Sequence, residues 1–196
     1  MNKRTTLLTT LMTTTLLAAP AWAEPTRYLV DDAHTFARFS YDHLGFSTQL
    51  SRIDNVSGHV DWDPAAGTAQ VSIDLDMNSV STGDETFDEH IRGDEFLDTK
   101  RFPTASFRST RVIFEDDVPV EIHGDLTIRG VTKPVTLTVN HFHQGMHPLA
   151  EREAIGANAT TVISRSAFEA GKYVPVVGDE VTIDVSFEAL VPADEQ

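Results

Sequence analysis

The sequence VPVEIHGDLTIRGVTKPVTLTVNHF, residues 118–142, alternates between apolar and polar side chains over most of its length. A period of two places successive side chains on opposite faces of a β-strand, so the stretch predicts two strands, each with one dry and one wet face. Gly130 and Pro134 bracket a short polar connection, which predicts a hairpin. The predicted dry faces hold Val120, Ile122, Gly124, Leu126 and Ile128 on the first strand and Val135, Leu137 and Val139 on the second.

The same alternation recurs on both sides of this hairpin. We count about eight such runs at short spacing with turn residues between them, a pattern that predicts a closed antiparallel barrel or a sandwich. The further dry faces are Ala37, Phe39, Tyr41 and His43; Gly58, Val60 and Trp62; Val71, Ile73, Leu75 and Met77; Ala105, Phe107 and Ile113; Ile155, Ala157, Ala159, Thr161 and Ile163; and Val181, Ile183, Val185, Phe187 and Ala189.

One segment, Ser81–Pro103, interrupts the strand pattern. Within it, Thr86–Arg92 has the apolar spacing of a short helix, Asp84 is a candidate N-cap, and Gly93 ends the run. Asp94–Thr99 is a candidate second helical turn. The sequence therefore predicts one helical insertion in an otherwise all-β chain.

Composition limits the function classes. The chain has 196 residues, which suits one domain, and 40% of them are hydrophobic, which is enough for a core. It contains no cysteine, which excludes disulfides and thiolate metal sites. The net charge of −15 disfavours nucleic acid and anionic lipid surfaces as partners.

Residues 1–23 have the pattern of a cleavable signal peptide. Lys3 and Arg4 precede a mostly apolar run, and Ala21-Trp22-Ala23 is a cleavage signature. The run is short and rich in threonine for a membrane span. We expect export to the periplasm and a mature domain of residues 24–196.

Several motifs in order resemble the YceI family. The most recognisable is Gly124-Asp125-Leu126-Thr127-Ile128-Arg129-Gly130-Val131-Thr132-Lys133-Pro134-Val135. The others are Asp32-Ala33-His34-Thr35, Phe39, His43-Leu44-Gly45, Gly58-His59-Val60, Trp62-Asp63, Phe96-Leu97-Asp98, Phe102-Pro103-Thr104-Ala105-Ser106-Phe107, Ser164-Arg165-Ser166-Ala167-Phe168 and Gly178-Asp179-Glu180-Val181. The chain departs from the family pattern at Ala167, where an acidic residue is common, and at Glu169, where glycine is usual.

The resemblance implies an eight-stranded, lipocalin-like antiparallel barrel with a short helical insertion. It also implies a binding or carrier protein that holds a polyisoprenoid, an isoprenoid quinone or another long apolar lipid in a central tunnel. A strand of about eight residues spans roughly 26 Å, long enough for an extended chain. The implied ligand-binding residues are Phe39, Tyr41, His43, Val60, Ile73, Leu75, Met77, Phe107, Ile122, Leu126, Ile128, Leu137, Val139, Ile163, Phe168, Ile183, Val185 and Phe187.

Other interpretations remain open at this point. A barrel filled by its own side chains gives the same alternation, and a homodimer is compatible with the sequence. His141, His143 and His147 are a candidate Zn or Cu site of a metal-binding or redox-accessory protein, with the first two expected on the dry face of Val139. His43 either donates to a ligand head group or is a structural histidine.

No catalytic motif is present. The chain lacks a G-x-S-x-G elbow, an H-E-x-x-H motif, a P-loop and a dinucleotide fingerprint. We therefore expect no enzymatic activity, no catalytic residues and no cofactor other than a bound lipid or quinone.

Overall fold

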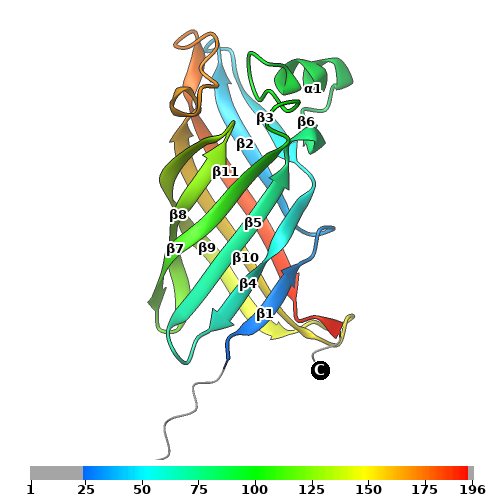
Figure 1. Cartoon of the computed structure of the whole chain (residues 1–196), viewed down its shortest axis with the longest axis vertical. Coiled ribbons are helices and arrows are strands. Elements are labelled where there is room, and N and C mark those ends of the chain that lie inside the picture. The colour runs from blue at the N-terminus through cyan, green and yellow to red at the C-terminus, as the bar shows by residue number, and fades with distance from the viewer. Residues whose placement is uncertain (1–23, 194–196) are drawn as a thin grey trace, which may run out of the picture.

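The structure is a computed structural model that describes residues 24–193, and Figure 1 shows these residues as one strongly curved antiparallel sheet. The elements are β1 (Thr26–Val30), β2 (Phe36–His43), β3 (Ser47–Ile53), β4 (Val56–Asp63), β5 (Thr68–Asp76), the 3-10 helix η1 (Met77–Ser79), β6 (Val80–Ser81), α1 (Glu85–Arg92), β7 (Thr104–Glu115), β8 (Val118–Ile128), β9 (Val131–Met146), β10 (Glu153–Ser164), the 3-10 helix η2 (Arg165–Phe168) and β11 (Val177–Leu190).

Eight strands form a closed ring in the order β1, β4, β5, β7, β8, β9, β10, β11, because β1 also pairs with β11. The closing pairs are Leu29 with Leu190 and Val30 with Ala189. Strands β2 and β3 continue the wall above β1 and β4, with β2 paired to β11 and β3 paired to β2. The predicted eight-stranded antiparallel barrel is confirmed. Pairing of β1 with β11 satisfies backbone groups that an open eight-stranded sheet would leave at its edges, which suits a chain without disulfides.

The predicted dry faces point into the barrel along most of the wall. The inward residues of β10 and β11 alternate along both strands, and their register is unbroken from Ala154–Leu190 to Ser164–Glu180. The same parity holds for Ala37 to His43 on β2 and for Val71 to Leu75 on β5. The alternation in the sequence therefore reports the inside of the barrel directly.

Two β-bulges change the inward parity at the lower end of β7 and β8. Ser109 and Arg111 pair with consecutive residues of β8, so Thr110 is the extra residue of β7. Ile113 pairs with Glu121 and the next residue of β7 pairs with Pro119, so Val120 is the extra residue of β8. The prediction that Ile113 and Val120 point into the barrel is therefore wrong. Val112 and Pro119 line the interior in their place, because one extra residue reverses the faces beyond it.

A third bulge lies in β9. Asn158 pairs with His141 and the next residue of β10 pairs with Val139, which leaves Asn140 as the extra residue. Beyond it Phe142 points into the barrel, whereas His141 and His143 do not line the interior. The expectation that these two histidines continue the face of Val139 is therefore wrong.

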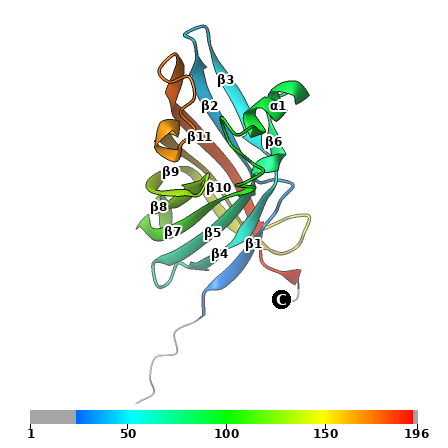
Figure 2. The ribbon, with the colours of Figure 1, turned by 45° about the horizontal axis from the view of Figure 1, so that its top comes forward.

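The helical insertion is present and lies at the upper end of the barrel (Figure 2). Helix α1 begins at Glu85, one residue before the predicted start. The carboxylate of Asp84 accepts a hydrogen bond from the backbone N–H of Phe87 at 2.9 Å, as an N-cap does. Gly93 ends the helix as predicted. The predicted helical turn at Asp94–Thr99 is wrong, because these residues form hydrogen-bonded turns instead.

The predicted signal peptide, residues 1–23, lies outside the described residues, so its removal and the mature domain boundary stay predictions. Strand β1 begins at Thr26, three residues after the expected cleavage site. Within residues 24–193, no helix has both the length and the apolar character needed to cross a membrane.

Candidate functional site: an apolar cavity along the barrel

The barrel encloses a cavity of about 360 Å³, within the range of small-molecule sites in proteins. Its wall is almost entirely aliphatic and aromatic and receives side chains from every strand of the ring except β1. The interior is therefore not completely filled by the protein's own side chains. All residues that the sequence predicted as ligand-binding line this cavity: Phe39, Tyr41, His43, Val60, Ile73, Leu75, Met77, Phe107, Ile122, Leu126, Ile128, Leu137, Val139, Ile163, Phe168, Ile183, Val185 and Phe187.

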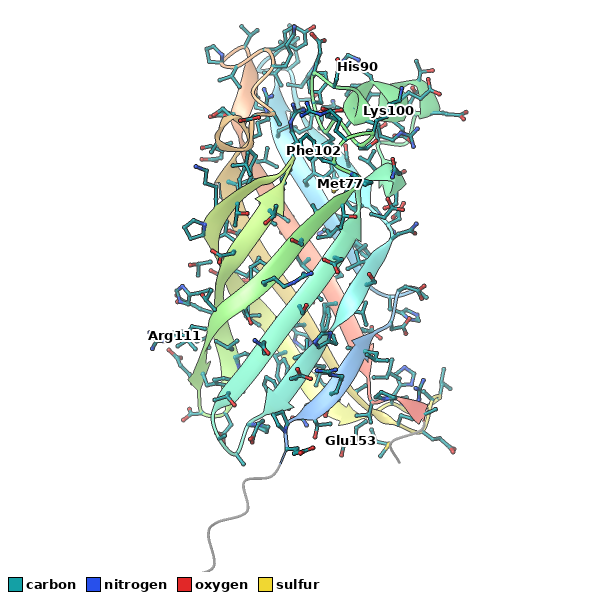
Figure 3. The ribbon with its side chains drawn as sticks, in the orientation of Figure 1. Met77, His90, Lys100, Phe102, Arg111 and Glu153 are labelled. Carbon is teal, nitrogen blue, oxygen red and sulfur yellow. The ribbon has the colours of Figure 1, made fainter. Side chains whose placement is uncertain are left out.

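The lower end of the cavity is sealed by packed aromatic rings. Trp62 lies 5.4 Å from Phe114 and 5.0 Å from Phe142 between ring centroids, and Tyr28 is fully buried beside them. Glu153, labelled at the lower end in Figure 3, accepts a hydrogen bond from the Tyr28 hydroxyl at 3.1 Å. Burial, together with this carboxylate, raises the pKa of Tyr28 to about 12. A ligand therefore has no path through this end.

The upper end has exposed groups in its wall and is the mouth of the cavity. Tyr173 lines the cavity and is half exposed, and His90 of α1, labelled in Figure 3, lines it while remaining exposed. Phe87, Phe96 and Leu97 of the insertion add apolar contacts. The cavity therefore opens between the insertion and the loop that follows η2, which lie on opposite sides of the upper end in Figure 2.

Arg165 organises the loop that forms one side of the mouth. Its Nε donates to Gly178 O at 2.7 Å, its Nη1 donates to Ala170 O and to Lys172 O at 2.9 Å, and its Nη2 donates to Val177 O at 3.0 Å. Burial lowers the pKa of Arg165, whereas the nearby Asp179 carboxylate opposes that change. The guanidinium thus holds the loop through four backbone hydrogen bonds and also lines the cavity.

Glu169, one of the two departures from the family pattern, sits where the chain turns out of η2. Its φ of 60° is in the left-handed region, which explains why glycine suits this position. Its N–H donates to Ser166 O at 3.1 Å, so the turn forms with glutamate as well. Ala167 and Glu169 are absent from the cavity wall, so neither departure alters it.

The two sides of the mouth contact each other. Lys172 and Glu95 form an ion pair, and the rings of Phe96 and Tyr173 lie 6.1 Å apart between centroids. The Glu95 carboxylate raises the pKa of Lys172. These contacts join the helical insertion to the loop after η2 directly above the cavity.

Several wall residues were not predicted from the sequence. Phe142 and Val112 were missed because of the bulges, and Arg165 and Tyr173 because they lie in segments without periodicity. Trp62 was placed on a dry face but not among the ligand-binding residues. The alternation does carry a signal for Trp62, since it shares the parity of Val60 on β4.

His43 lines the cavity near the mouth, opposite Val177 of β11. Within residues 24–193, its imidazole has neither a hydrogen-bond nor an ion-pair partner, which a structural histidine would need. Its ring is therefore available to a group in the cavity mouth.

The histidines at 141, 143 and 147 do not come together as a metal site. His147 Nδ1 instead accepts backbone hydrogen bonds from Leu149 N at 3.3 Å and Ala150 N at 3.0 Å. In the described part of the chain, the group with metal-ligand proximity is Asp31, His34 and Glu188, whose ligand atoms lie within 4.8 Å of one another.

That group is accounted for by an ion pair in the turn between β1 and β2. His34 Nδ1 lies 2.8 Å from Asp31 Oδ2, and Asp31 Oδ1 accepts a hydrogen bond from Ala33 N at 3.0 Å. The partner of His34 is therefore Asp31. The interaction lowers the pKa of Asp31 and raises that of His34.

Comparison with known sequences finds a match to one domain family. The model of the YceI-like domain matches residues 28–189. A UPF0312 protein of Pseudomonas putida is 32% identical over 191 residues, covering 97% of this chain and 98% of the relative. A UPF0312 protein of Vibrio vulnificus is 31% identical over 173 residues, covering 87% of this chain and 89% of the relative.

Solved structures give the same fold. The crystal structure of BcnA from Burkholderia cenocepacia has a TM-score of 0.68 at 25% identity and covers 82% of this chain and 99% of BcnA. The YceI protein of Campylobacter jejuni has a TM-score of 0.64 at 25% identity, covering 76% of this chain and 88% of that one. A domain of Saccharophagus degradans described as polyisoprenoid-binding has a TM-score of 0.65 at 18% identity, covering 84% and 98%.

Proposed function

The chain belongs to the YceI-like family, and on that basis we propose that it is a periplasmic carrier that binds a long isoprenoid lipid inside its barrel. The observation that carries the proposal is the apolar cavity of about 360 Å³, closed below and open above. Each methylene moved from water into such a wall contributes about 0.8 kcal/mol before ordering costs. Affinity for a long chain therefore needs few polar contacts.

Two further observations support the details. The structural neighbour from Saccharophagus degradans is described as a polyisoprenoid-binding domain, which favours a polyisoprenoid as ligand. An isoprenoid quinone carries the same kind of apolar chain and is included in the proposal. Lys3, Arg4 and the Ala21-x-Ala23 signature favour export to the periplasm. The role is binding, and no chemical step is assigned to the protein.

The test is mass spectrometry of lipid extracted from the purified protein, combined with bulky substitutions in the wall. Leu126 and Leu137 line the cavity from neighbouring strands. Leu126→Trp and Leu137→Trp project a ring into the space that the ligand chain needs. We expect lipid occupancy to collapse, while the melting temperature of the lipid-free protein stays near that of wild type because the cavity accepts the ring.

Val162→Trp is the matched control. Val162 lies on β10 with 52% of its surface exposed, between inward residues, so its replacement adds the same ring outside the barrel. We expect normal lipid occupancy in this variant. Full occupancy in both wall variants, or an absence of any apolar lipid from wild type, would refute the proposal.

A further inference from the structure

Several polar side chains that line the cavity lie at its mouth. Tyr41 and His43 are the last two inward residues of β2, and Arg165 follows Ile163, the last inward residue of β10. Tyr41 and Ile163 both pair with Val181 of β11, which places the Tyr41 hydroxyl near the Arg165 guanidinium. A chain bound in the sealed barrel therefore has its polar end among these groups.

The Tyr41 hydroxyl lacks a hydrogen-bond partner among residues 24–193, although its ring is packed in the core cluster of Phe107 and Phe168. Burial raises the pKa of Tyr41, which keeps the hydroxyl protonated as a donor. Tyr41 is only partly buried and its side chain lines the cavity, so a ligand oxygen in the mouth can accept a hydrogen bond from the hydroxyl.

Arg165 retains one donor for the same space. A guanidinium has five N–H groups, and four of them donate to backbone carbonyls of the loop. The remaining N–H belongs to Nη2. Together with the Tyr41 hydroxyl, it offers two donors to one ligand oxygen, a number suited to a hydroxyl or carbonyl rather than to the several oxygens of a phosphate.

Charge at the mouth also disfavours a phosphate. Arg165 lies beside Asp179, and Lys172 is paired with Glu95, so the charge of each cation is already offset. The other arginine on the cavity wall, Arg38, is exposed on the outward parity of β2. A phosphate adds a charge of about −1.5 to −2 at pH 7, which these groups do not neutralise.

We propose that the mouth selects isoprenoids with an uncharged oxygen-bearing head group, an alcohol or a quinone carbonyl, and holds that oxygen between Tyr41 and Arg165. This inference rests on the proposed lipid-binding function and specifies the ligand class. Phosphorylated isoprenoids of equal chain length bind more weakly. Tyr41 is thereby a specificity-determining residue.

The test compares three probes of equal chain length: geranylgeraniol, geranylgeranyl monophosphate and the hydrocarbon phytane. Trp62 is the only tryptophan after residue 23 and lines the cavity, so its fluorescence in lipid-free protein reports binding. We expect geranylgeraniol to bind more tightly than both other probes. Tyr41→Phe weakens geranylgeraniol binding by about threefold to tenfold, the range for one lost hydrogen bond, and leaves phytane binding unchanged.

Tyr28→Phe is the matched control, because it removes a hydroxyl at the sealed end and leaves the affinities for all three probes unchanged. Thermal melting verifies that both variants are folded. Tighter binding of the monophosphate than of the alcohol, or an unchanged alcohol affinity in Tyr41→Phe, overturns the head-group proposal while phytane binding still supports a lipid cavity. Failure of all three probes to bind overturns the lipid-binding function itself, and the head-group proposal with it.

Discussion

Gly124 is the position at which the shape of the cavity wall is most sensitive to one added methyl group. A Cβ at this residue would lie 2.5 Å from Cζ of Phe107 and 2.6 Å from the carbonyl oxygen of Arg108. Favourable carbon contacts begin near 3.5 Å, so Gly124→Ala forces the ring and the backbone of β7 to move. The Phe107 ring is displaced into the cavity, because it already lies against the wall.

We expect Gly124→Ala to destabilise the protein by about 1–3 kcal/mol, the usual cost of overpacking. For a domain of this size, each kcal/mol lowers the melting temperature by about 2–4 °C. Thermal melting of lipid-free protein measures this change, and mass spectrometry of co-purified lipid measures the accompanying loss of cavity space. We expect occupancy to fall below that of wild type.

Gly156→Ala on β10, two strands away from β8, provides the control. Its Cβ would lie 3.5 Å from the carbonyl oxygen of Phe187 and 3.8 Å from Cγ of Glu188, which are ordinary contacts. This substitution should leave stability unchanged or raise it by about 0.4–1 kcal/mol, because alanine restricts the unfolded chain. If Gly124→Ala melted at or above the temperature of Gly156→Ala, the close packing of Phe107 on Gly124 would be refuted.

Three further outcomes are expected. N-terminal sequencing of the exported protein begins at Glu24, and a full-length N-terminus in the periplasmic fraction would contradict the signal peptide. Replacing the three histidines within residues 141–147 by Ala changes stability by no more than about 0.5 kcal/mol and leaves lipid occupancy intact. Stoichiometric Zn or Cu in wild type that is absent from this variant would instead support a metal site at these histidines. His34→Gln lowers the melting temperature most in the acidic window above the ordinary pKa of an aspartate and below that of a histidine, where both partners are charged. Because the pKa of His34 is raised, the stabilisation from the ion pair is lost as pH rises through the His34 pKa. Because the pKa of Asp31 is lowered, the stabilisation is also lost as pH falls through the Asp31 pKa. A difference in melting temperature between wild type and His34→Gln that did not depend on pH would count against this ion pair.

The cavity wall was largely predictable because a strand has a strict period of two. Ile183 and Val185 on β11 and Ile163 on β10 lie in ladders whose register is continuous, so sequence parity alone gives their direction. Burial of one face specifies that register strongly, since a slip of one residue would expose every apolar side chain.

The bulges were not predictable by the same reasoning. The extra residues Thr110, Val120 and Asn140 are ordinary strand residues themselves. Pro119 beside Val120 and Gly124 opposite Ser109 are residue types that often mark a bulge, but neither shows which residue is the extra one, and Asn140 has no such neighbour in its ladder. Their insertion depends on how neighbouring strands close the ring, which is a long-range property. Beyond each bulge, the side chains that were predicted to point inward therefore point outward, and the reverse.

The mouth was predictable only in part. Asp84 and Gly93 marked the ends of α1, because helix caps depend on local chemistry. Arg165 and Tyr173 occupy a loop whose conformation is determined by hydrogen bonds to distant carbonyls, and no local pattern reports those contacts. At the polar end of the site, Tyr41 and His43 were predicted from the parity of β2, whereas Arg165 and Tyr173 were missed.

The contacts that join the two sides of the mouth can affect the rate at which a ligand leaves without changing how tightly the ligand is bound. We expect a bound chain to leave through the upper end more readily when Lys172 parts from Glu95 and Tyr173 from Phe96, whereas the apolar wall below supplies the affinity. The exposed ion pair is screened by salt, but burial of methylenes is not. If the protein binds a lipid as proposed, we expect the residence time of that lipid to shorten with ionic strength while equilibrium occupancy stays nearly constant.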